Sequence, residues 1–202
     1  MTTATTADLC AELILHLGRL GQQAPGAARL TPAQWTALRF FARANRFSRT
    51  PSAFSSFHAT TRGTASQTVK SLVSAGYLTR KPSETDGRSS LFELTEAGRD
   101  MLAADPLKTL SAALERMPDG ERAALDQGLR DLLAQVALDR GAETFGTCGD
   151  CRFLDREAPG AGTRWVCSCT AAGLISDDFD KLCVNFAPAA AEPDEAGTTP
   201  AR

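Results

Sequence analysis

The sequence is poor in aromatic residues and has no long apolar run. Aromatic residues make up 6% of the 202 residues, and tyrosine occurs once. Alanine and leucine dominate the apolar 43%, a composition that favours helices over a large sheet. No apolar run approaches the roughly 18 residues that span a bilayer, and the N-terminus lacks the pattern of a secretion signal. We therefore expect a cytoplasmic, mainly helical protein that has no membrane partner.

The common motifs of enzymes are also missing. The sequence has neither a phosphate-cradling glycine-rich loop nor a Gly-x-Ser-x-Gly turn. Only two histidines occur, His16 and His58, and neither has a nucleophile or an acid at a suggestive spacing. We therefore predict no catalytic residues and a protein that is not an enzyme.

Charge is distributed unevenly along the chain. The block from Arg29 to Ser90 contains ten lysines and arginines but only two acids, so it carries +8. Because the whole chain carries −2, the remainder carries −10. A basic block inside an acidic chain is typical of a protein that binds a polyanion such as nucleic acid.

Helical patterns fill the first 76 residues. Leucines recur at helical spacing within Thr6–Leu20. Thr31-Pro32 is typical of a helix start, because threonine caps the helix and proline fits its first position. A short helix begins near Pro51, and another covers about 64–75. Gly76 then suits the positive φ that ends many helices.

A hairpin and two long helices are predicted next. Tyr77–Lys81 and Leu91–Leu94 have the pattern of short strands around a turn-rich loop. Thr95 is the predicted cap of a helix that runs towards Met117. A second long helix covers about 121–138. Its apolar stripe would pack in a core or against a second chain: Leu125, Leu129, Leu132, Leu133 and Val136.

The order helix, helix, turn, helix, hairpin is the plan of a winged helix-turn-helix. Its recognition helix enters the major groove of double-stranded DNA with its N-terminal residues towards the base edges. The candidates there are short polar or cationic side chains, which can pair with bases or phosphates: Arg62, Thr64, Ser66, Gln67, Thr68 and Lys70. Arg80, Lys81 and Arg88 flank the hairpin loop, and Arg88 best suits the backbone or minor groove.

Four motifs support this interpretation by their order and spacing. They are Thr61-Arg62-Gly63-Thr64-Ala65-Ser66-Gln67-Thr68-Val69, Leu72-Val73-Ser74-Ala75-Gly76-Tyr77-Leu78, Asp86-Gly87-Arg88 and Leu94-Thr95-Glu96-Ala97-Gly98-Arg99. Together they resemble the recognition helix, the Asp-x-Arg wing tip and the Leu-Thr-x-x-Gly helix start of the MarR family of bacterial regulators. The resemblance covers residues 31–138.

The resemblance implies a homodimer that binds a palindromic operator, often as a repressor. The two recognition helices would then lie roughly 34 Å apart, one turn of DNA. Residues 7–20 and 106–138 would form the dimer interface. Small ligands often bind between the dimer helices and the DNA-binding lobe in this family, so a small-molecule effector is a further implied partner.

Five of the six cysteines lie close together near the C-terminus. The spacing is Cys148-x2-Cys151-x15-Cys167-x-Cys169-x13-Cys183. In a reducing compartment such a cluster favours a metal over disulfides. Cys148, Cys151 and Cys183 are the firm ligands, and Cys167 and Cys169 are alternates. Cys10 stands alone on an apolar helix face and is predicted to be a buried structural thiol.

The bound species stays open between three states. Four thiolates can hold Zn²⁺ or an iron–sulfur cluster such as [4Fe-4S], and free thiols could still sense oxidants. Aromatic residues near the cysteines, such as Phe153, Trp165 and Phe186, give a short resemblance to high-potential iron–sulfur proteins. That resemblance favours iron–sulfur slightly over zinc.

The sequence therefore predicts a mainly α-helical chain with a small β-wing in three parts. Residues 1–140 form the DNA-binding and dimerisation domain, 141–186 the cysteine-rich module, and 187–202 a disordered tail. We expect a transcriptional regulator that senses through its cysteines. The alternatives are a regulator that senses a small aromatic ligand beside a structural zinc, an iron–sulfur redox protein, and a partner-binding adaptor.

Overall fold

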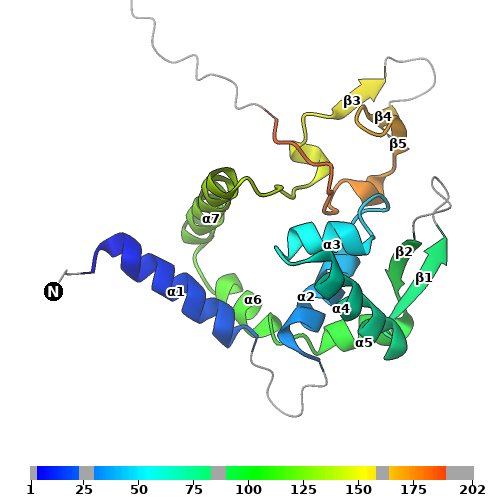
Figure 1. Cartoon of the computed structure of the whole chain (residues 1–202). Helices are drawn as coiled ribbons and strands as arrows, with labels where there is room; N and C mark the ends of the chain where they lie inside the picture. The colour runs from blue at the N-terminus through cyan, green and yellow to red at the C-terminus, as the bar shows by residue number, and fades with distance from the viewer. Residues whose placement is uncertain (1–3, 23–29, 83–89, 158–163, 190–202) are drawn as a thin grey trace, which may run out of the picture.

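The structure is a computed structural model that describes residues 4–22, 30–82, 90–157 and 164–189. The fold is mainly helical, with a two-stranded hairpin and a small three-stranded sheet near the C-terminus. Figure 1 shows α1 (Thr6–Leu20) and α7 (Asp119–Arg140) on one side of the chain and the helix-turn-helix with its hairpin on the other. Within the described ranges, no helix combines the length and apolar character of a membrane span.

The predicted helix-turn-helix is present as α2 (Pro32–Arg43), α3 (Pro51–Phe57) and α4 (Arg62–Ser74). Each helix begins after a threonine whose hydroxyl accepts a hydrogen bond from the backbone N–H three residues later. Such caps satisfy an N–H that the helix itself leaves unpaired. The three capping residues are Thr31, Thr50 and Thr61.

The predicted wing is an antiparallel hairpin of β1 (Leu78–Pro82) and β2 (Ser90–Leu94). Gly76 precedes it with φ +77°, which confirms the positive φ expected at the end of α4. Residues 83–89 of the wing loop, including Arg88, lie outside the described residues.

Aromatic rings fill the core beneath this region. Phe40 and Phe41 of α2 and Phe54 of α3 are almost fully buried, and the first two rings meet edge to face at 5.3 Å. Leu72 of α4 and Leu78 of β1 complete the contact between helices and wing. Burial of a large apolar side chain contributes about 1.5–3 kcal/mol, so this core fixes the position of α4.

The helix predicted from Thr95 towards Met117 is broken, and that prediction was wrong. The structure has α5 (Glu96–Ala103) and α6 (Lys108–Glu115) instead, with Pro106 between them. Proline lacks the N–H of the helical ladder, and its ring clashes with the preceding turn, so it interrupts a helix. The sequence analysis gave too little weight to Pro106.

A bidentate ion pair secures this break against α2. Arg39 donates from Nε and Nη2 to the two carboxylate oxygens of Asp105, at 2.7 and 2.8 Å. Asp105 also accepts from the N–H of Leu107 at 2.8 Å and so caps the next turn. The side chains are only 19% and 10% exposed, which limits screening of the pair by water.

Replacing Arg39 with methionine is expected to lower the free energy of unfolding by about 2 kcal/mol, because Asp105 keeps its charge without a partner. Adding Asp105→Asn to that variant should restore part of the loss. Urea unfolding of both single variants and the double variant measures the coupling. Equal losses that simply add would contradict a direct interaction.

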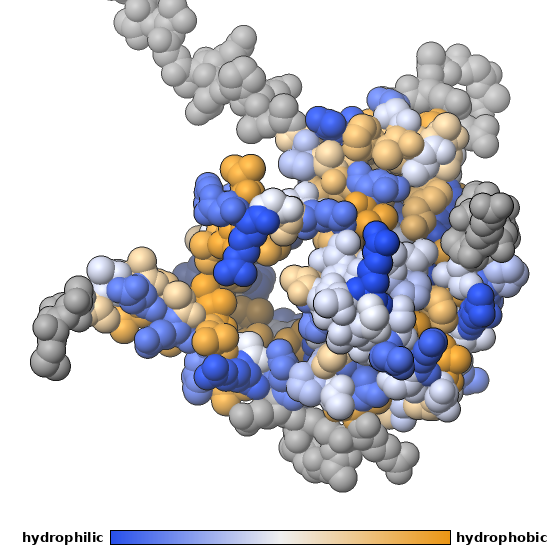
Figure 2. Space-filling model, viewed as in Figure 1, coloured by the Kyte–Doolittle hydropathy of each residue, from blue (hydrophilic) through white to orange (hydrophobic). Residues whose placement is uncertain are grey.

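α1 and α7 expose their apolar faces. All 15 residues of α1 are described and none is buried; Leu13 is 60% exposed and Leu133 of α7 is 66% exposed. Figure 2 shows apolar surface over α7 and along α1. Cys10 of α1 is also exposed, so its prediction as a buried thiol was wrong in the single chain.

The cysteine-rich region contains a three-stranded antiparallel sheet that the sequence analysis did not predict. Its strands are β3 (Leu154–Glu157), β4 (Arg164–Cys167) and β5 (Ala172–Leu174), in that order. Short 3-10 turns flank the sheet at Cys148–Asp150 and Ser176–Asp178.

This region packs directly on the helix-turn-helix core. Leu182 is buried in that core, and the half-buried Phe145 and Val184 pack against it. Leu182 donates to Arg43 O at 2.7 Å, and its own carbonyl accepts from Asn45 N at 2.9 Å. The predicted parts 1–140 and 141–186 therefore share one core.

The first residues of the predicted disordered tail are ordered. Ala187 O accepts from Arg152 N at 3.0 Å, and Ala189 N donates to Asp150 O at 3.0 Å. Residues 190–202 lie outside the described residues.

Candidate DNA-binding surface and cysteine cluster

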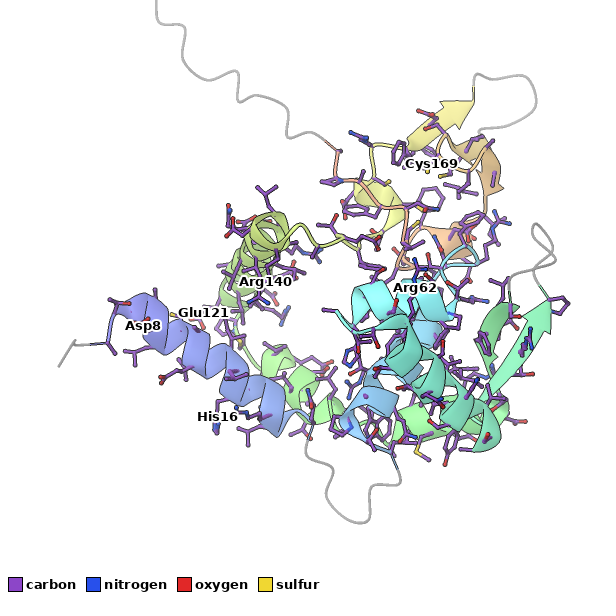
Figure 3. All side chains as sticks on the ribbon, viewed as in Figure 1. Asp8, His16, Arg62, Glu121, Arg140 and Cys169 are labelled. Carbon is purple, nitrogen blue, oxygen red and sulfur yellow. The ribbon has the colours of Figure 1, made fainter. Side chains whose placement is uncertain are left out.

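The recognition helix α4 exposes a polar face. Its apolar residues Ala65, Val69 and Leu72 are buried against the core. The opposite face carries four exposed candidates for DNA contact, at helical spacing: Arg62, Thr64, Gln67 and Lys70. Figure 3 labels Arg62 at the start of the helix.

Two other candidates on this helix are less accessible. Ser66 and Thr68 are half-buried, and the Thr68 hydroxyl donates to Thr64 O at 3.1 Å. Thr61, the N-cap, accepts from Thr64 N at 3.2 Å. The N-terminal turn of α4 is therefore preorganised, with short hydroxyls beside the exposed cation and amide.

The cations of the wing differ in their availability. Arg80 is exposed and donates to Ser90 Oγ at 2.6 Å, across the hairpin. Lys81 Nζ lies 2.6 Å from Glu93 Oε2, and Arg49 reaches the other oxygen at 3.2 Å. The hydrogen bond from Lys81, with the charges of both cations, holds the pKa of Glu93 below its usual range. Lys81 is thus largely neutralised, and Arg80 is the freer of the two.

Four of the five clustered cysteines converge on one place. Cys148 and Cys167 are buried together with Leu174, while half-buried apolar and aromatic side chains pack around them: Phe47, Phe153, Leu154, Trp165 and Phe179. Burial, followed by the negative charge of Cys183, Cys151 and Cys167 as thiolates, raises the pKa of Cys148 to about 11. These thiols are therefore electrostatic neighbours.

Cys183 reaches the same place from the C-terminal segment. Its N–H donates to Gly146 O at 3.0 Å. Burial raises the pKa of its thiol, while polar contacts from Asn45, from the Asn185 N–H and from Ser48 act in the opposite direction. Those contacts from residues 45 and 48 belong to the segment between α2 and α3.

Cys169 lies apart from the other four. It is exposed in the turn after β4, as Figure 3 shows, whereas Cys167 is buried at the end of that strand. The antiparallel pairing of Cys167 with Leu154 brings Cys167 beside the Cys148–Cys151 turn. The structure thereby separates the two residues that the sequence spacing left as alternates.

Single-ion coordination is not preformed. Across residues 4–22, 30–82, 90–157 and 164–189, no group of three or more His, Cys, Asp or Glu side chains is arranged so that it could hold a metal ion. Zinc with four thiolates needs every sulfur about 2.3 Å from one ion. The four converging cysteines do not offer that arrangement.

Comparison with known proteins concerns the helix-turn-helix and the wing. Residues 30–89 match a family model described as "MarR family". This segment is a MarR-family region. The family consists of DNA-binding transcriptional regulators rather than enzymes. No curated protein matches the chain.

Solved structures share the fold of the MarR-family region and its flanking helices. A cysteine-to-serine mutant of MarR from E. coli is similar with a TM-score of 0.50 and 22% identity, over 66% of this chain and 99% of that one. A glycine-to-lysine mutant of MepR from S. aureus gives 0.51 and 15%, over 66% and 99%. The matched family segment ends before the clustered cysteines begin.

Sequence reasoning missed the polar segment that connects the MarR-family region to the cysteines. Asn45 and Ser48 are both buried and touch residues more than 130 positions away. No local pattern marks them, although a buried asparagine and serine between two helices call for hydrogen-bond partners.

Proposed function

We propose that the chain is a homodimeric transcriptional repressor that binds a palindromic operator. The observation that carries this proposal is the exposed face of α4, with Arg62, Gln67 and Lys70 beside a basic wing. A helix seated on a rigid core with such a face suits the major groove, where Gln pairs with adenine and Arg with guanine.

The dimer is supported by the exposed apolar residues of α1 and α7. Twelve large apolar side chains on these two helices are at least 39% exposed. Two copies related by a twofold axis would cover both helices and place two α4 helices on one side of the assembly. Palindromic half-sites about 10 base pairs apart follow from that symmetry.

An operator can be obtained without knowledge of the target genes. DNA that the wild-type protein enriches from a random pool should be palindromic. Fluorescence anisotropy on that DNA then gives the affinity at several salt concentrations. A reporter promoter that overlaps the site should be transcribed less when the protein is present. Enrichment of no common sequence would refute the proposal.

Two substitutions in α4 should have different effects. Gln67→Ala should relax the preference at one base pair in each half-site, at a cost of about 1–3 kcal/mol per contact. Lys70→Ala should weaken binding to all sequences and reduce the salt slope by about one per subunit. Arg88→Ala in the wing should also weaken binding and flatten the salt dependence.

Ser74→Ala is the matched control, because Ser74 is exposed in the last turn of the same helix. It should bind the operator as the wild type does. If Gln67→Ala, Lys70→Ala and Arg88→Ala all bind with unchanged affinity, the DNA-binding surface lies elsewhere.

We further propose that the cysteine region tunes the affinity for DNA. Its support is the direct packing of Leu182 and Val184 on the helix-turn-helix core. A regulator that responds to a small molecule, with the cysteines as a structural zinc site, is the competing proposal. One zinc per chain and an operator affinity that a chelator leaves unchanged would favour that competitor.

A further inference from the structure

We infer that Cys148, Cys151, Cys167 and Cys183 bind an iron–sulfur cluster and that Cys169 lies outside the ligand set. We also infer that this cluster strengthens DNA binding by ordering residues 44–50. The second statement rests on the proposed function, whereas metal content tests the first statement by itself.

Backbone contacts bring the four cysteines together. Cys151 N donates to Cys148 O at 3.2 Å, within a single tight turn. Leu154, which follows that turn, pairs with Cys167 of β4. The bridge between Gly146 and Cys183 brings the C-terminal segment to the start of the same turn. The ligand set is therefore built from three chain segments held by hydrogen bonds.

The surroundings are apolar and aromatic. Phe153 and Trp165 pack around Cys148 and Cys167 from one side, and Phe47 does so from the helix-turn-helix. Trp165 also meets Phe179 edge to face at 5.7 Å. An apolar shell controls how far water reaches a bound cluster and so tunes it.

An iron–sulfur cluster suits this donor set better than zinc does. One zinc ion would need four sulfurs around a single point, and the described residues do not present such a point. In a cluster the thiolates bind different iron atoms, so they stand farther apart. Four neighbouring thiols without a single-ion geometry favour the larger group.

A buried amide supports the same assignment. Asn45 is 1% exposed, and its Nδ2 makes no hydrogen bond of ordinary length and angle, although Cys183 lies beside it. Hydrogen bonds to ligand sulfurs are a regular feature of iron–sulfur sites. Binding of a cluster would turn Cys183 into a thiolate and give this donor its acceptor.

Residues 44–50 connect the cysteines to the wing. Ser48 Oγ accepts from Val184 N at 2.8 Å, next to Cys183. One residue further, Arg49 O accepts from Phe92 N of β2 at 2.8 Å, and its side chain reaches Glu93 at 3.2 Å. The wing and the cysteine site are thus attached to the same short segment. Loss of the cluster should loosen that segment and lower the affinity for DNA.

The experiment begins with the full chain purified without oxygen. Iron, acid-labile sulfide and zinc are measured, and a visible absorption spectrum is recorded. Serine is then introduced singly at Cys148, Cys151, Cys167 and Cys183, with Cys169→Ser and Cys10→Ser as matched controls. We expect iron, sulfide and colour in the wild type and both controls, and their loss in the four ligand variants. Circular dichroism identifies any variant that does not fold.

Asn45→Asp provides a test that does not remove a ligand. It keeps the Oδ1 that accepts from Phe47 N at 3.1 Å but replaces the Nδ2 donor with a charge beside Cys183. The folded variant should release iron to a chelator faster than the wild type. Retention at the wild-type rate would contradict the role given to this amide.

Several outcomes would overturn the assignment. The protein could lack iron both as purified and after anaerobic incubation with ferrous iron and sulfide, or it could hold one zinc without colour. Loss of iron in Cys169→Ser but not in Cys167→Ser would exclude the ligand set.

The effect on DNA is measured separately, with loaded and cluster-free protein on the enriched operator. We expect the loaded form to bind at least about fivefold more tightly, the lower end of typical couplings. Equal affinities would remove the coupling and leave the DNA-binding function intact. Iron without DNA binding in either form would refute the proposed function and leave the cluster in place.

Discussion

Replacing Gly98 with alanine is expected to lower the free energy of unfolding by at least about 3 kcal/mol, the upper range for overpacking a rigid site. Gly98 is buried in the first turn of α5, where it packs against the end of α4. A Cβ there would overlap Tyr77 O and lie 3.1 Å from Tyr77 C. Backbone atoms cannot turn away as a flexible side chain can, so α5 would have to move.

The hydrogen bonds at this junction explain why α5 cannot move cheaply. Thr95 Oγ1 donates to Gly76 O at 2.6 Å, and Thr95 N donates to Tyr77 O at 3.1 Å. Gly98 N in turn donates to Thr95 Oγ1 at 3.0 Å. A shift of α5 would break this set beside β1, so the variant should lose operator affinity as well as stability.

Gly120→Ala is the control for this prediction. Gly120 lies in the first turn of α7, and a Cβ there meets no atom within 4 Å. Alanine is favoured over glycine in a helix by up to about 1 kcal/mol, so this variant should be slightly more stable. Urea unfolding at one fixed protein concentration compares the two. If Gly98→Ala unfolds at the wild-type midpoint, α5 does not pack on Tyr77 as described.

Local signals in the sequence were sufficient for the helix-turn-helix. Threonine caps, Pro32 and Gly76 act within a few residues, so the beginnings and ends of α1 to α4 could be predicted from them. The hairpin followed from the change of pattern after Gly76. The motif around Gly98 was recognised from its spacing, but its cause, the close approach to Tyr77, appears only in three dimensions.

Contacts between distant residues were beyond prediction. The choice between Cys167 and Cys169 depends on the register of β4 with β3, and the short strands gave no clear alternating pattern. The partnership of Ser48 with Val184 spans 136 residues. One sequence contains no statement about such pairs, because each residue alone is compatible with many partners.

Replacing Leu132 with glutamate is expected to convert the dimer to a monomer and to weaken operator binding by at least about 100-fold. Leu132 lies within the exposed apolar stripe of α7, between Leu129 and Val136. In a twofold interface each substitution occurs twice, so two charges would be buried without partners. A monomer would bind one half-site and lose the gain of about 10²–10⁴ that linking two sites supplies.

Gln127→Glu is the matched control, because it adds the same charge to the polar side of α7, where Gln127 donates to Asp131 at 2.8 Å. This variant should stay dimeric and bind the operator with only the small loss that one added negative charge per subunit causes. Sedimentation equilibrium measures the mass of each variant, and anisotropy at constant salt measures its affinity. A Leu132→Glu protein that remains dimeric would place the interface elsewhere. A monomeric variant with wild-type affinity would instead show that one winged helix is sufficient, and the apolar faces of α1 and α7 would then need another partner.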